Sequence, residues 1–156
     1  MLGALGAWAA VGRAQAPDPL AAVTSADPME LARVVDRLGD GAVLDRLAED
    51  SPRTVRLSAV RAARWMTGPE LALAPLAELA SGRDPLLAPE AARATRVIVE
   101  GLTADGLARR EVEPASLSTA RRRLAALAAD ESARSDLRAA AMIAADVLDA
   151  LGVPES

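Results

Sequence analysis

Apolar residues follow one another along this chain at the three- and four-residue spacing of an amphipathic helix, and the pattern comes in blocks. A short motif, Leu-x-x-Leu-Ala, begins at Leu44, at Leu76 and again at Leu124. Each copy is followed by a polar or glycine-containing break and then by a second apolar stretch with helical spacing. Residues spaced in this way share one helix face, so the pattern predicts a two-helix unit that recurs three times.

The second helices of the three units align with one another, starting at Val55, Leu87 and Leu137. The first, fifth, eighth and twelfth positions are apolar in every copy, which predicts that they form the buried face. The fifth and eighth positions are always Ala, and such small side chains predict that each second helix lies close to its partner. The predicted face comprises Val55, Ala59, Ala62 and Met66, then Leu87, Ala91, Ala94 and Ile98, and finally Leu137, Ala141, Ala144 and Leu148.

The breaks between these stretches divide the chain into segments. We predict repeats over residues 40–68, 69–102 and 115–152, a degenerate N-terminal capping repeat over 17–39 and a C-terminal tail over 153–156. Asp27 and Pro28 suit the N-cap and first turn of a helix in the capping repeat. An inserted loop over 103–114 precedes the last repeat, and because it is the longest break we predict that it is the most mobile segment.

Composition adds the fold class and narrows the chemistry. Hydrophobic residues make up 51% of the chain but aromatics only 1%, and Ala and Leu, both strong helix formers, carry the apolar content. The predicted class is therefore all-α. The chain has no Cys, His or Lys, which removes thiol nucleophiles, the commonest general base and Schiff-base chemistry. We predict a non-catalytic protein without a cofactor or metal, and the net charge of −4 argues against nucleic-acid binding.

The N-terminal residues 1–16 read as a secretory signal peptide or apolar leader. Residues 2–11 are uninterruptedly apolar, too short to span a bilayer, and an Ala-x-Ala pattern ends at Ala16. No basic residue precedes the run, and Pro17 would hinder cleavage directly after Ala16. The predicted location is periplasmic or secreted. The alternative is a cytoplasmic protein in which the apolar run packs as a first helix on the repeats.

The arrangement resembles the HEAT-repeat family in its short bacterial form. The matching features are the Leu-x-x-Leu first helix, the turn at Asp50 and the second-helix start Val55-Arg56-x-x-Ala59, which recurs as Leu137-Arg138-x-x-Ala141. The resemblance implies a short right-handed α-solenoid of about three to four antiparallel helix pairs, whose second helices line a concave face that binds other macromolecules. Tetratricopeptide repeats are the competing assignment, but their large aromatic positions are missing here.

Arginines on the second helices are the candidate partner-binding residues. Arg61 and Arg64 of the first copy align with Arg93 and Arg96 of the second, and stacked repeats would place them in two short columns. Guanidinium groups suit acidic side chains or another carboxylate-bearing partner. Arg56, on the same helix as Arg61, completes the predicted set.

The alternative is a solvated face on which these arginines form ion pairs with Glu90, Glu100 or Asp146. In the third copy Ile143 and Asp146 stand at the arginine positions, which favours this alternative. Trp65 could anchor a partner, but its equivalents Val97 and Val147 are also apolar, so we predict that it packs between repeats.

The function predicted from these features is a non-catalytic protein–protein interaction or scaffold module, exported to a bacterial envelope and binding another protein of unknown identity. An intracellular regulatory or assembly subunit is the alternative. A HEAT-like enzyme is a remote one, because without His, Cys, Lys or Tyr the acid–base repertoire shrinks to Asp, Glu and Arg.

Overall fold

The computed structural model describes residues 16–23, 27–110 and 112–154, and these residues form helices joined by turns, without a strand. The all-α prediction is confirmed for them, while the predicted leader lies almost wholly outside the described residues. The elements are α1 (Pro19–Ala22), α2 (Pro28–Leu38), α3 (Asp40–Leu47), α4 (Arg53–Ala62), η1 (Ala63–Trp65), η2 (Pro69–Ala72), α5 (Leu73–Ala80), α6 (Leu87–Glu100), α7 (Ala104–Arg109), α8 (Pro114–Ala129) and α9 (Ser135–Ala150).

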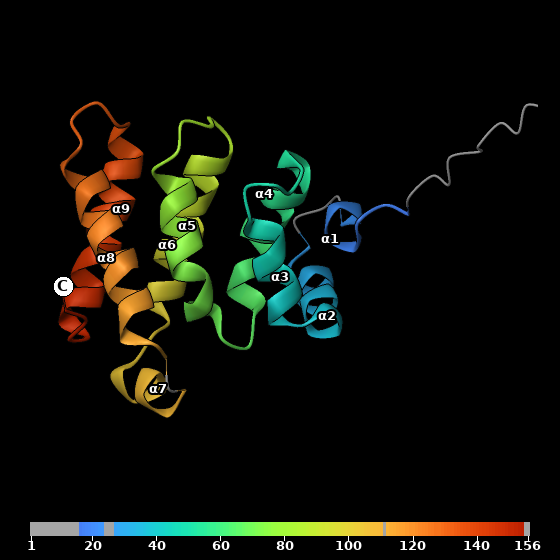
Figure 1. Cartoon of the computed structure of the whole chain (residues 1–156), viewed down its shortest axis with the longest axis horizontal. Helices are drawn as coiled ribbons and strands as arrows, with labels where there is room; N and C mark the ends of the chain where they lie inside the picture. The colour runs from blue at the N-terminus through green and yellow to red at the C-terminus, as the bar shows by residue number, and fades with distance from the viewer. Residues whose placement is uncertain (1–15, 24–26, 111, 155–156) are drawn as a thin grey trace, which may run out of the picture.

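The helices that carry the repeated motif pack in pairs, α3 with α4, α5 with α6 and α8 with α9 (Figure 1). The pairs also contact one another in chain order. The first helices meet as α3, α5 and α8, and the second helices meet as α4, α6 and α9. Two layers of helices therefore enclose one apolar core, and the second helices form a layer of their own.

The predicted buried face is confirmed at nearly every position. Ala59, Ala91 and Ala141, the fifth residues of the aligned helices, are completely buried. Val55 is the exception and is only half-buried. It lies in the first turn of α4, although the aligned Leu87 and Leu137 are buried in the first turns of α6 and α9. Small side chains at the centre of each second helix thus coincide with close packing of the pair.

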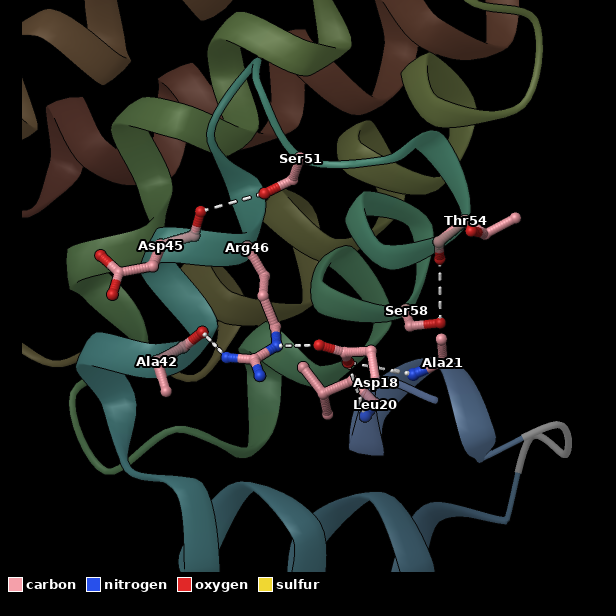
Figure 2. A network of polar contacts seen from close by, with 9 residues as sticks. All are labelled: Asp18, Leu20, Ala21, Ala42, Asp45, Arg46, Ser51, Thr54 and Ser58. Carbon is pink, nitrogen blue, oxygen red and sulfur yellow. Dashed lines mark hydrogen bonds and ion pairs between the residues drawn. The ribbon is translucent and has the colours of Figure 1, made fainter. Parts of the chain in front are cut away.

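The N-terminal segment is tied to the first pair by a polar network around Asp18 (Figure 2). The Asp18 carboxylate accepts hydrogen bonds from the backbone N–H groups of Leu20 and Ala21, which caps α1. Its other oxygen accepts from Arg46 Nε at 2.8 Å, and Arg46 Nη1 donates to the Ala42 carbonyl oxygen within α3. Leu20 is fully buried as well. Apolar packing and the ion pair with Arg46 therefore both hold α1 against the first helix pair.

Helix α2 begins as the sequence predicts. The side chain of Asp27 accepts a hydrogen bond from Met29 N, and Pro28 occupies the first position. The helix ends at Leu38 and is followed by Gly39, whose φ of 80° lies in the left-handed region that favours glycine. The turn leads directly into α3.

The inserted segment differs from the loop that the sequence predicts, because it contains helix α7. Thr103 caps α7 by accepting a hydrogen bond from Gly106 N at 3.1 Å. Directly after the helix, Arg110 Nη1 donates to Glu70 Oε2 at 2.7 Å, and the Glu70 side chain is only 2% exposed. The insertion therefore contacts the second helix pair at η2, through an ion pair between residues far apart in the sequence.

Candidate partner-binding face

A cavity of about 440 Å³ opens where α2, α4 and α6 meet. Its apolar lining comes from all three helices, with Leu31 on α2, Val60 on α4 and Ala94 on α6, each buried. The other lining residues are Arg61, Arg64, Glu90, Arg93 and Val97. Three of the five predicted arginines thus surround an opening whose base is apolar.

Glu90 lies at the centre of the charges around this cavity. Arg93 Nη1 lies 2.7 Å from Glu90 Oε1 within α6, and Arg61 Nε reaches from α4 to 3.7 Å from Glu90 Oε2. Further along α6, Arg96 Nε pairs with Glu100 Oε1 at 2.8 Å. The ion pairs that the alternative interpretation predicted with Glu90 and Glu100 are therefore present.

These ion pairs leave the cavity positively charged. Its lining contains three arginines and one glutamate, a net charge of +2. The side chains of Arg61 and Arg93 are at least half exposed. Glu90 is 26% exposed, so the pairs lie at the surface, where an ion pair contributes about 0–1 kcal/mol.

Trp65 lies on the surface, and the prediction that it packs between repeats is wrong. Its side chain is 37% exposed, and the equivalent Val97 is 41% exposed. Val97 belongs to the uninterrupted helix α6, so the 3₁₀ turn η1 does not by itself account for the exposure of Trp65. At the helical rotation per residue, both residues lie about 90° from the centre of the buried face. The guanidinium carbon of Arg64 lies 5.0 Å from the centroid of the Trp65 ring, within cation–π distance.

Arg56 is separated from the other predicted arginines. It lines a different cavity, near the α3–α4 and α5–α6 turns, together with Leu47 and Asp84. Arg61 stands five positions further along the helix, which is a rotation of about 140° around its axis. The five predicted residues are thus not one patch, and Arg96 does not line the basic cavity either.

The basic face, which comprises Arg61, Arg64 and Arg93 around this cavity, does not extend to α9. Ile143 and Asp146 stand at its arginine-equivalent positions, and neither lines the cavity. Sequence reasoning missed the part that α2 plays in the cavity. Leu31 was recognisable as part of an apolar helix face, but nothing in the sequence pattern indicated that it meets the cleft between α4 and α6.

The described residues hold neither a metal-ion cluster nor a membrane-spanning helix. Among them, no group of three or more Asp or Glu side chains is arranged to hold a metal ion. In the same part of the chain, each helix is too short or too polar to cross a membrane. No protein-family model matches the chain, and no curated protein or solved structure shows significant similarity to it.

Proposed function

We propose that this chain is a non-catalytic scaffold module, a short HEAT-like α-solenoid that docks to another protein. The proposal rests on the recurring two-helix unit and on the consecutive contacts of α4, α6 and α9, which would give a solenoid a continuous inner layer. In this reading α2 and α1 belong to an irregular capping repeat at the N-terminal end.

The partner surface that fits this face is an acidic segment carrying a large apolar side chain. The observation that carries this proposal is the cavity between α4 and α6, where Arg61, Arg64 and Arg93 surround an apolar base. Trp65 and Val97 add exposed apolar surface close by, and an aromatic residue beside arginine is a composition enriched at the centres of protein interfaces.

A selection with peptides tests this directly. A library of random peptides is displayed to the wild-type chain, and the binders are then titrated against Arg61→Glu/Arg93→Glu. We expect the selected sequences to be enriched in Asp and Glu beside a Leu, Ile, Phe or Trp. Their affinity should fall about tenfold or more for the variant, because two attractive contacts become repulsive.

The matched control reverses two arginines elsewhere, Arg109→Glu/Arg122→Glu, both on exposed parts of α7 and α8. This control has the same net charge as the test variant, so a general charge effect would weaken both equally. Selected peptides that bind both variants alike, or that show no acidic enrichment, would remove the arginines of α4 and α6 from the function.

The proposed location is outside the cytoplasm, because the apolar run of residues 2–11 precedes an Ala-x-Ala pattern. The described fold begins close behind it, with Asp18 and Leu20 already fixed against the repeats. Fusion of residues 1–30 to an export reporter tests this location. Export of the reporter supports it, whereas retention in the cytoplasm favours the intracellular regulatory or assembly subunit instead.

A further inference from the structure

A second cavity, of about 480 Å³, lies on the side of the turns, between the α3–α4 and α5–α6 connections. Leu47 at the end of α3 and Leu87 at the start of α6 are buried and form apolar parts of its lining, and Pro75 of α5 adds to them. Cavities of this size in proteins accommodate small organic molecules or the end of a peptide.

Arg56 lines this cavity and carries an unsatisfied hydrogen-bond donor. Its Nε atom is buried and has no hydrogen-bond partner in the part of the chain that the structure describes. Arg138 stands at the equivalent position of the third repeat, and its Nε donates to the carbonyl oxygen of Ala128 at 3.4 Å. The same position can therefore be satisfied within a repeat, and Arg56 instead keeps a buried donor whose desolvation is costly unless something accepts from it.

Asp84, an acid in the lining, is already engaged. It accepts from Arg53 Nε at 2.6 Å and from Arg53 Nη2 at 2.8 Å, and from the backbone N–H groups of Leu86 and Leu87. The hydrogen bonds from Arg53, followed by those from the two backbone groups, hold the pKa of Asp84 well below its ordinary value. Asp84 thus stays ionised and stays paired with Arg53.

Glu78 is paired as well, with Arg123 Nη1 at 2.7 Å from its Oε2. The remaining charged residues of the lining are Glu49, Arg56 and Arg83, and none of these three forms an ion pair within the described part of the chain. Their net charge is +1. All five charged residues of the lining together carry −1, but Arg53 and Arg123, which lie outside the lining, neutralise Asp84 and Glu78. The cavity thus offers one unit of unpaired positive charge, an arginine with an unsatisfied donor, and an apolar wall.

We propose that this cavity binds a single carboxylate carried on an aliphatic stem, with Arg56 donating to the carboxylate and Leu47 and Leu87 packing against the stem. The guanidinium group matches a carboxylate in geometry and charge. The acids around the cavity disfavour a dianion such as a phosphate monoester. The carboxylate can come from a free aliphatic acid or from the C-terminus of a polypeptide.

Calorimetric titration of the whole chain with three small probes tests the proposal. We expect hexanoate to bind at one site, and hexanamide, which has the same shape without the charge, to bind about tenfold more weakly or worse. Hexyl phosphate should also bind more weakly than hexanoate. Arg56→Met, which keeps an unbranched stem, should lose hexanoate binding, whereas the matched control Arg138→Met should bind it as the wild type does.

The proposal is overturned if hexanoate does not bind, if hexanamide binds equally well, if hexyl phosphate binds more tightly, or if Arg56→Met keeps full affinity. Should Arg56→Met fail to fold, the comparison of hexanoate with hexanamide on the wild type decides. A peptide ending in Leu with a free carboxylate, set against its amidated form, identifies the source. Tighter binding than hexanoate indicates a polypeptide terminus, and weaker binding indicates a small acid.

This inference is independent of the basic face. Arg61→Glu/Arg93→Glu leaves every residue of the second cavity unchanged. That variant should therefore bind hexanoate like the wild type, even where it loses acidic peptides.

Discussion

The ion pair between Arg110 and Glu70 should hold the inserted segment against the second helix pair, and Arg110→Ala tests it. Glu70 is 2% exposed on η2, while the Arg110 side chain is 47% exposed at the end of α7. Removing Arg110 takes away a donor at 2.7 Å and leaves a buried carboxylate oxygen without it. The inserted segment then loses a contact that holds it against the second helix pair.

The expected loss of stability is about 2 kcal/mol. A buried acceptor left without its partner costs about 1–3 kcal/mol, and breaking a fully buried ion pair costs about 3–5 kcal/mol. Because the Arg110 side chain is half exposed, water can partly replace it. The loss of stability should therefore fall in the range for an unpaired buried acceptor and not in that for a fully buried ion pair. For a chain of this length the loss corresponds to a fall in Tm of about 4–8 °C.

Two measurements separate this contact from a general effect of mutation. Thermal unfolding compares Arg110→Ala with its neighbour Arg109→Ala. The Arg109 Nε atom donates to the Asp105 carbonyl oxygen within α7, so this control should change the free energy of unfolding by less than about 0.5 kcal/mol. Hydrogen exchange follows α7 itself. The amide of Leu107, bonded to the Thr103 carbonyl oxygen at 3.0 Å, should exchange faster in Arg110→Ala.

A double-mutant cycle completes the test. Glu70→Met removes the buried charge and keeps an apolar side chain of similar length, so Arg110→Ala should cost little in that background, with a coupling energy of about 1–2 kcal/mol. The reasoning is refuted if Arg110→Ala is as harmless as Arg109→Ala, or if the two substitutions at Arg110 and Glu70 are additive.

Three further substitutions probe other parts of the fold. Asp18→Ala removes both the cap of α1 and the ion pair with Arg46, and should cost about 1–2 kcal/mol in urea unfolding, against little change for the exposed Asp36→Ala. Ala91→Leu overfills a completely buried position and should cost about 1–3 kcal/mol, whereas Ala125→Leu on the exposed side of α8 should be nearly neutral. The pKa of Asp84 is lowered in the folded chain, so its ionised form stabilises the fold fully above the ordinary aspartate pKa of about 3.9, and this contribution shrinks as the pH falls from there toward the lowered pKa. The difference in Tm between wild type and Asp84→Asn should therefore narrow from pH 7 to pH 2.

The repeated helices could be predicted from the sequence because packing follows the apolar period. Ala59, Ala91 and Ala141 are alike in spacing and alike in burial, since each lies at the centre of a second helix against its partner. The cap at Asp27 was predictable for a similar reason, because it depends only on its own neighbours. Local chemistry and helical period therefore account for the pairs.

Features that depend on distant contacts could not be predicted. The apolar character of Trp65 and Val97 was visible, but both are exposed, whereas the equivalent Val147 packs against the core. Exposure at this position therefore depends on which neighbouring helices reach it. Helix α7 lies in a polar segment, where apolar spacing gives little signal. Its contact with Glu70 joins residues that no spacing rule relates.

The candidate site was predictable only in part. The recurrence of Arg61 as Arg93 correctly indicated a shared face, and both line the same cavity. Arg56 shares a helix with Arg61 but points to another cavity, since the spacing between them turns it away. The prediction counted the arginines on the helix without considering their angles around the helix axis. It therefore treated two separate surfaces as one.

The central claim is that the face of α4 and α6 docks an acidic segment of another protein. Chemical-shift mapping of the isotopically labelled chain, titrated with an acidic peptide selected on it, tests this most directly. We expect the largest saturable shifts at the amides of Val60, Arg64, Trp65, Arg93 and Val97, and their loss in Arg61→Glu/Arg93→Glu. Shifts centred on α7 and α8, or shifts that persist unchanged in the variant, would contradict the claim.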